Sequence, residues 1–124
     1  MDFLRRRKIL KDKNYLDLTP VRKVEYEQEG NLVTLLIPKF TSAFAVKFIV
    51  PRMKSRYIKL KLDELGSASW LEIDDNTNVR ELCNRLRNKL GDKIEPVEER
   101  LTRFLTRLYM EKIISFKEIE GEKL

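Results

Sequence analysis

The sequence contains few side chains that could catalyse a reaction. It has no histidine and a single cysteine, Cys83. The lack of histidine excludes Ser-His and Cys-His catalysis, histidine metal ligands and a histidine pH switch. One cysteine without histidine leaves no plausible structural zinc site, and a lone cysteine forms no internal disulfide. We therefore expect no bound metal, and the cysteine count is typical of a reducing compartment.

The acidic residues do not suggest a catalytic pair either. Asp74-Asp75 and Glu98-Glu99 are adjacent in sequence, so the two members of each pair do not share one face of a regular element. Roles in a turn and at a helix start explain them better. With only four glycines, the chain also has no Gly-rich loop for a phosphate. These observations predict a binding protein without catalytic residues or a cofactor, and not an enzyme.

Basic residues are the more promising functional groups. The net charge is +6, and residues 39–61 contain seven basic residues and no acidic one. This charge favours an acidic partner such as nucleic acid, an anionic membrane surface or an acidic peptide. Residues 1–15 form a basic N-terminal extension, read either as a solvated terminus or as an arm that contacts a membrane or nucleic acid.

Two clusters could bind such a partner. Lys59 and Lys61 alternate with Ile58 and Leu60 in a predicted strand over residues 56–62. If one edge of that strand is unpaired, its N–H and C=O groups can pair with an extended peptide, and the lysines would attract acidic side chains.

The second cluster is a stripe of arginines in the last predicted helix. Arg100, Arg103 and Arg107 are spaced at i, i+3 and i+7, so they share one helix face. That face could contact the phosphates or bases of DNA. Because Glu98, Glu99 and Glu111 are interspersed with it, a solvated helix face explains the stripe equally well.

The elements that position these residues follow from the hydrophobic pattern. Residues 21–28 and 32–37 alternate around the turn signal Glu29-Gly30-Asn31 and predict a β-hairpin, after an extended lead-in over residues 16–20. In residues 39–55, aromatic residues at helical spacing favour a short helix over another strand. That insertion could also expose an aromatic patch to a membrane or partner.

Three helices are predicted after the third strand. Asp63 can cap the first helix, in which residues 66–69 make a slim face and Trp70 is a core anchor. Thr77 is the expected N-cap of the second helix, which has an apolar stripe through Cys83 and ends at Gly91. Pro96 begins the third, and a short strand or extended tail follows it. The sequence contains no run of about 18 apolar residues, so it predicts no membrane span. It also contains no recognisable secretory signal, so we expect a cytoplasmic protein.

This order predicts an α+β fold with a three-stranded antiparallel sheet followed by a three-helix, winged-helix-like bundle. One reading of that order is a winged-helix-type DNA-binding protein, with the arginine stripe on the DNA. A winged helix usually has a β-hairpin after its last helix, and the residues after about 114 contain no turn for one. This makes nucleic acid the less favoured partner.

The chain from Leu62 to Leu82 resembles the PqqD family. The similar residues are Leu62-Asp63, the small-residue run before Trp70, Ile73-Asp74, and residues 78–82, NVREL. The hairpin before them and residues 104–114 after them follow the family's order, so that the resemblance covers about residues 18–116. Asp63 replaces the family's usual asparagine, Asp75 its usual glycine, and the connection over residues 39–55 is longer than in the family.

The resemblance implies a PqqD-like peptide-binding domain over residues 16–119, with residues 39–55 as an insertion and 120–124 as a tail. Such proteins bind the leader of a ribosomally made precursor peptide by strand addition and present it to a modifying enzyme, often a radical SAM enzyme. A second copy of the chain, forming a homodimer, is a further candidate partner. Carried over to this sequence, the peptide groove would be formed by Tyr57, Ile58, Lys59, Leu60, Lys61, Leu62, Arg100, Arg103, Phe104 and Arg107.

Overall fold

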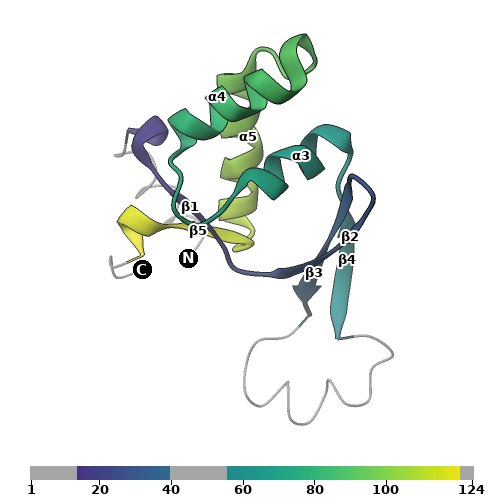
Figure 1. The fold of residues 1–124 in the computed structure, drawn as a ribbon. Coiled ribbons are helices and arrows are strands. Elements are labelled where there is room, and N and C mark those ends of the chain that lie inside the picture. The colour runs from purple at the N-terminus through teal and green to yellow at the C-terminus, as the bar shows by residue number, and fades with distance from the viewer. Residues whose placement is uncertain (1–13, 40–55, 121–124) are drawn as a thin grey trace.

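The three-stranded antiparallel sheet expected from the sequence is present, and three helices follow it (Figure 1). The computed structural model describes residues 14–39 and 56–120. The strands are β1 (Pro20–Arg22), β2 (Glu25–Glu29), β3 (Leu32–Pro38), β4 (Tyr57–Lys61) and β5 (Ile114–Phe116), and the helices are α3 (Glu64–Glu72), α4 (Val79–Leu90) and α5 (Val97–Met110). Single 3-10 turns are formed by Tyr15–Asp17, Gly91–Lys93 and Lys117–Ile119. The predicted α+β class is confirmed.

The β2–β3 hairpin has the predicted turn. Glu29 pairs with Leu32, so Gly30 and Asn31 are the two residues of the loop. Gly30 has a φ of 61°, which glycine adopts without steric cost at the first central position of a type II′ turn. β4 then pairs with β3 in antiparallel register, with Leu60 opposite Leu35 and Ile58 opposite Ile37.

The prediction of one strand over residues 21–28 was wrong. β1 and β2 belong to different sheets, because β1 pairs with β5, with Val21 opposite Ser115. The Lys23 N–H donates to the Ile113 carbonyl at 3.0 Å, and β2 starts two residues later. The lead-in is also only partly extended, since it begins with the 3-10 turn capped by Asn14. Alternation along one segment cannot reveal which distant strand supplies its hydrogen bonds.

The register divides the sheet into two faces. The inner face packs against the helices through Val33 and Leu35, which are 1% and 0% exposed. Residues paired across strands share a face, so Leu60 and Ile58 of β4 also point to this side. The outer face carries the intervening residues: Glu25, Glu27 and Glu29 on β2, Leu32, Thr34, Leu36 and Pro38 on β3, and Tyr57, Lys59 and Lys61 on β4.

Ser67 joins the start of α3 to the end of the β3–β4 ladder. The Leu62 N–H donates to the Val33 carbonyl at 2.9 Å, but the Val33 N–H donates to the Ser67 hydroxyl instead, also at 2.9 Å. Ser67 is fully buried. Its hydroxyl therefore fixes where α3 lies beside the last residues of β4.

We expect Ser67→Ala to lower the free energy of unfolding by about 1–3 kcal/mol, since it leaves a buried N–H of Val33 without an acceptor. Urea unfolding followed by circular dichroism measures this change. The control is Ser115→Ala, which removes a hydroxyl from the half-buried middle residue of β5. Equal stability of Ser67→Ala and wild type would contradict the role assigned to the hydroxyl.

One predicted helix N-cap is confirmed, and another is formed by a neighbouring residue instead. The Asp63 carboxylate accepts the Gly66 N–H at 2.7 Å and caps α3, as predicted. The N-cap of α4 is Asn78 and not Thr77, because Asn78 Oδ1 accepts the Glu81 N–H at 2.9 Å. The Thr77 hydroxyl donates to the Asp74 carboxylate and closes the preceding turn. Both residues are good caps, and sequence alone could not choose between them.

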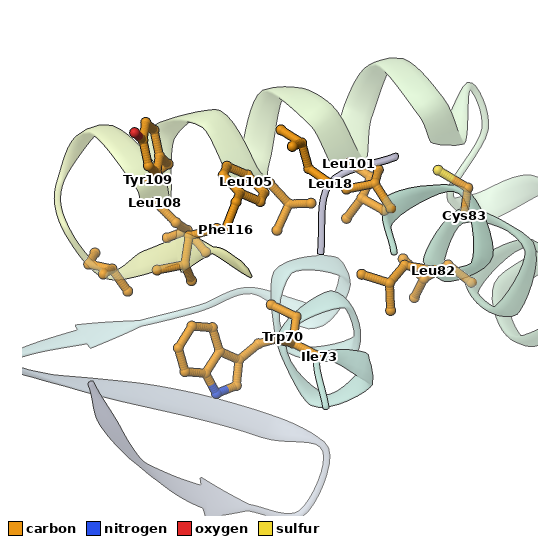
Figure 2. Close-up of a cluster of buried hydrophobic side chains, with 14 of the residues drawn as sticks. Leu18, Trp70, Ile73, Leu82, Cys83, Leu101, Leu105, Leu108, Tyr109 and Phe116 are labelled. Carbon is orange, nitrogen blue, oxygen red and sulfur yellow. The ribbon is translucent and has the colours of Figure 1, made fainter. Parts of the chain in front are cut away.

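The core lies between the helices and the inner face of the sheet (Figure 2). α5 contributes Leu101, Leu105 and Leu108, which point toward α3 and α4. Trp70 is fully buried on the sheet side of α3, and its ring meets that of Tyr26 edge-on with centroids 5.9 Å apart. The Arg22 guanidinium lies 5.2 Å from the Trp70 ring and donates to the Trp70 carbonyl at 2.7 Å. The core role predicted for Trp70 is confirmed.

Glu118 ties the end of the described chain to its beginning. Its carboxylate accepts the Thr19 N–H at 2.6 Å and the Thr19 hydroxyl at 2.7 Å. Burial raises the pKa of Glu118, but the hydrogen bonds from Thr19 and from the Glu118 backbone N–H, together with the charge of Lys117, lower it by more and hold the pKa below its usual range. The ionised carboxylate therefore favours the folded state.

A pH dependence follows from this lowered pKa. The stabilisation is complete above the unfolded-state pKa of about 4.3 and is lost as pH falls through the lower folded pKa. Glu118→Gln should cost about 1 kcal/mol at pH 7, allowing for exposure of the carboxylate, and should unfold with a shallower loss of stability below pH 4.5. Thermal melts from pH 3 to pH 7 measure both effects, and identical pH profiles of variant and wild type would contradict them.

Several predictions lie outside the described residues. They concern the basic extension up to Lys13, the helix and aromatic patch within residues 40–55, and the tail after Glu120. Within the described part of the chain, no helix is long and apolar enough to cross a membrane.

Candidate functional site

β4 is an edge strand of its sheet. Among residues 14–39 and 56–120 it pairs with β3 only. The Leu62 N–H donates to Val33, and Arg56 accepts from Lys39, so the even-numbered residues of β4 direct their backbone groups to β3. Antiparallel ladders alternate, and the N–H and C=O groups of Lys59 and Lys61 therefore point away from β3. These groups form the backbone edge that an added strand would use.

Apolar side chains accompany this edge on the inner face. Ile58 and Leu60 point to the helix side of the sheet, yet they are 54% and 41% exposed. Leu35, the β3 partner of Leu60, is fully buried, and Ile37, the partner of Ile58, is half-buried. The helices thus cover the centre of the inner face and leave the β4 side open to solvent.

A small pocket lies next to the point where β4 passes into α3. It has a volume of about 150 Å³ and is lined by Asp63, Leu65, Gly66, Ser69, Ile94, Arg100, Leu101 and Phe104. A Cβ built at Gly66 would lie 3.5 Å from the Phe104 ring and 3.5 Å from Leu62 Cβ, which is ordinary van der Waals contact. Phe104 of α5 therefore packs beside the residue that follows β4. The structure brings Arg100 and Phe104 to the same end of the molecule as Leu62.

Arg103 and Arg107 lie in different surroundings. They line a shallow depression of about 520 Å³ together with Tyr15, Glu99, Thr102 and Thr106. Tyr15 accepts the Thr106 hydroxyl at 2.9 Å, and Arg103 donates to Glu99 at 2.8 Å. Of the arginines predicted to form one stripe, only Arg100 lines the pocket beside Phe104, where it also donates to the Lys93 carbonyl at 2.8 Å.

Comparison with known protein families decides what kind of domain this is. The sequence model of the family described as "Coenzyme PQQ synthesis protein D (PqqD)" matches residues 49–114, more than half of the chain. The chain belongs to the PqqD family. The match includes β4, the three helices and the first residue of β5, and it leaves out the β2–β3 hairpin. Searches of curated proteins and of solved structures found no match.

The positions at which this PqqD-family chain departs from the usual pattern keep the expected local geometry. Asp63, in place of asparagine, caps α3 through a side-chain oxygen that asparagine also has. Asp75, in place of glycine, has a φ of 66°, a region in which glycine is free of strain. Its carboxylate accepts the Arg22 N–H at 3.0 Å, which offsets part of that strain.

Sequence reasoning missed the residues that complete the pocket. Leu65, Ser69 and Ile94 line it, but in the sequence they look like ordinary helix and loop positions. Ile94 follows the 3-10 turn after α4 and is 3% exposed. The one sequence feature that could have predicted this contact is the apolar side chain of Ile94 within the charged stretch GDKIEP.

Two titratable groups in the described part of this PqqD-family chain are shifted by burial. Burial raises the pKa of the Cys83 thiol, which is 2% exposed, so that the thiol is a poor nucleophile. Burial also raises the pKa of Tyr15. No group of three or more His, Cys, Asp or Glu residues in the described ranges is placed to hold a metal ion.

Proposed function

We propose that this protein is a non-catalytic adaptor that binds the leader of a ribosomally made precursor peptide and presents it to a modifying enzyme of the radical SAM type. Membership of a family described by coenzyme PQQ synthesis supports a role in the biosynthesis of a peptide-derived product. The single observation that carries the proposal is the edge of β4, with outward backbone groups at Lys59 and Lys61 and exposed apolar side chains at Ile58 and Leu60.

A leader added to β4 would contact apolar side chains on one side of the sheet and basic side chains on the other. Its backbone would pair with Lys59 and Lys61, and its side chains would alternate between the two sides of the sheet. Side chains on the inner side would contact Ile58 and Leu60 and could reach the pocket at Phe104. Those on the outer side would lie near the two lysine ammonium groups. The expected ligand therefore alternates apolar with acidic residues.

The test is a selection from a displayed library of random 12-residue peptides, followed by NMR titration of the ¹⁵N-labelled protein with an enriched peptide. We expect enrichment of alternating apolar and acidic residues, and amide shifts at residues 56–62 and around Phe104. A 20-base-pair DNA duplex serves as the second ligand. If the duplex shifts the same amides and the peptides do not, with affinity that falls steeply with salt, the adaptor proposal is wrong.

A further inference from the structure

β2 forms a second open edge of the three-stranded sheet. Within the part of the chain that the structure describes, it pairs with β3 only, as β4 does on the other side. Glu29 pairs with Leu32 across the two-residue loop, so the odd-numbered residues of β2 direct their backbone groups to β3. The N–H and C=O groups of Tyr26 and Gln28 therefore point away from the sheet. An extended chain can pair with these four groups.

The side chains of β2 give this edge an acidic side. Glu25, Glu27 and Glu29 lie on the outer face about 7 Å apart along the strand, and all three are exposed. Tyr26 and Gln28 lie on the inner face, where Tyr26 is half-buried and Gln28 is exposed. A strand added to β2 would therefore place every second side chain beside a carboxylate.

These carboxylates are only weakly satisfied within the chain. Glu27 Oε1 is 3.7 Å from Lys59 Nζ, and both side chains are 60% exposed, so this pair contributes little to stability. Glu25 and Glu29 form no ion pair with any residue that the structure describes. All three charges are available to cations from outside the chain. They also oppose pairing of this edge with its copy on a second chain, because like charges would then lie close together.

We propose that the β2 edge is a strand-addition site for a second protein, which supplies an extended segment with a basic residue at every second position. The basic side chains lie on the outer face beside the glutamates, and the backbone of the segment pairs with Tyr26 and Gln28. In an adaptor that presents a leader, this second protein is the modifying enzyme. Only that last assignment rests on the proposed function.

The opposite charges of the two edges direct different ligands to them. β4 carries Lys59 and Lys61 on the same face on which β2 carries its glutamates. An acidic leader is thus attracted to β4 and repelled by β2, and a basic segment is attracted to β2. Neighbouring strands are about 4.8 Å apart, so the two edges are separated by roughly 10 Å, and both ligands can be bound at once.

The β2 site is weak because it offers few groups. It has the outward backbone groups of two residues and three exposed carboxylates, and neither depression described above adjoins it. We expect a dissociation constant on the order of 1 mM at low salt for a short basic peptide. The constant should rise several-fold between 20 mM and 300 mM NaCl, because the charges are at the surface. A library selection for tight binding therefore yields ligands of β4.

The probe is an octapeptide of four Lys-Thr repeats with blocked ends, titrated into the ¹⁵N-labelled full chain in 20 mM NaCl. NMR should show amide shifts at residues 25–29 and not at residues 57–61. A peptide of four Glu-Thr repeats should leave the amides of residues 25–29 unchanged.

Backbone N-methylation of the probe tests strand pairing. In the proposed register the threonines lie opposite Tyr26 and Gln28, and their N–H groups point to β2. Methyl groups on the threonine nitrogens should abolish binding. Methyl groups on the lysine nitrogens, which point to solvent, should leave the affinity within about twofold, and this peptide is the matched control.

The charge of the site is tested in a variant that carries Glu25→Gln, Glu27→Gln and Glu29→Gln. It should bind the Lys-Thr peptide about tenfold more weakly, because each exposed pair contributes a factor of roughly two. NMR titration measures the affinity, and circular dichroism verifies the fold.

The control variant removes the same number of charges from the α5 region. It carries Glu98→Gln, Glu99→Gln and Glu111→Gln, all at exposed positions, and its affinity should stay within about twofold of wild type. Equal weakening in both variants would show that net charge alone attracts the peptide, and the site on β2 would be wrong.

Three further results would overturn the proposal. They are β2 amides that the Lys-Thr peptide does not shift, equal binding by the two N-methylated peptides, and a saturating β4 ligand that lowers the affinity for the Lys-Thr peptide more than tenfold. A variant with Arg5→Gln, Arg6→Gln and Arg7→Gln tests the competing occupant. If it shifts the amides of residues 25–29 without any peptide, the edge is occupied by this chain's own basic N-terminus and not by a second protein.

The test separates this site from the proposed function. Absence of any acidic ligand for β4 would contradict the adaptor and leave the result at β2 unchanged. Leader binding to β4 without binding of the Lys-Thr peptide would contradict the second site alone.

Discussion

Lys59→Pro is expected to weaken binding of an extended peptide roughly 10- to 100-fold while the domain stays folded. The Lys59 N–H points away from β3, so proline removes a donor that the fold does not use. In the complex, the lost hydrogen bond and the unsatisfied peptide carbonyl together cost about 1.5–3 kcal/mol. Isothermal titration calorimetry with a selected peptide measures the loss, and circular dichroism measures the folding.

Two other strand positions provide matched controls for the proline substitution. Leu60→Pro removes an N–H that the register directs to Leu35, so it should destabilise the sheet itself. Gln28→Pro makes the same change on the opposite edge, since Gln28 of β2 also points its N–H away from β3, and it should leave peptide affinity unchanged. Lys59→Ala keeps the N–H and tests the ammonium group alone. Strong peptide binding by folded Lys59→Pro would rule out strand addition to β4.

The sequence predicted the elements that depend on local pattern. The hairpin around Gly30, the third strand and the three helices all follow from alternation, helical spacing and turn residues within short windows. Asp63 as a cap and Trp70 in the core were recognised for the same reason. These features are set by interactions between residues close in the chain.

Non-local pairing could not be predicted. The partner of β1 is β5, more than ninety residues later, and no alternation within residues 20–22 identifies it. The same limitation explains why the expected single strand over residues 21–28 divides at Lys23. It also explains why the hydrogen bonds from Thr19 to the Glu118 carboxylate were not predicted.

The arginine stripe shows which part of the candidate site could not be predicted from the sequence. Arg100, Arg103 and Arg107 do share a helix face, as their spacing predicts. Each residue turns a helix by about 100°, so Phe104 lies about 40° to one side of Arg100 and Arg103 about 60° to the other. The pocket at β4 lies on the Phe104 side, and Arg103 and Arg107 line the depression at Tyr15. Which side faces a groove depends on how α5 packs, and spacing alone does not contain that information.

Trp70→Ala should produce the largest loss of stability of any single substitution considered, about 3–5 kcal/mol. The indole is fully buried and contacts both Tyr26 and the Arg22 guanidinium. Its removal leaves a cavity between α3 and the sheet and exposes a charged group to a void. Since small domains have only about 5–15 kcal/mol of stability, the variant should melt well below wild type or fail to fold. Circular dichroism melting measures this, because the variant lacks the only tryptophan.

Trp70→Phe separates stability from function at this position. The indole Nε1 has no hydrogen-bond partner in the described structure, so phenylalanine loses ring volume but no hydrogen bond. We expect a cost of about 1–2 kcal/mol and unchanged peptide affinity, because Trp70 supports the inner face from within the core. Phe104→Ala should do the opposite, since Phe104 is half-buried beside the end of β4 and lines the pocket. A folded Trp70→Phe variant that no longer binds peptide would show that the tryptophan contacts the ligand, and the purely structural role assigned to it would be wrong.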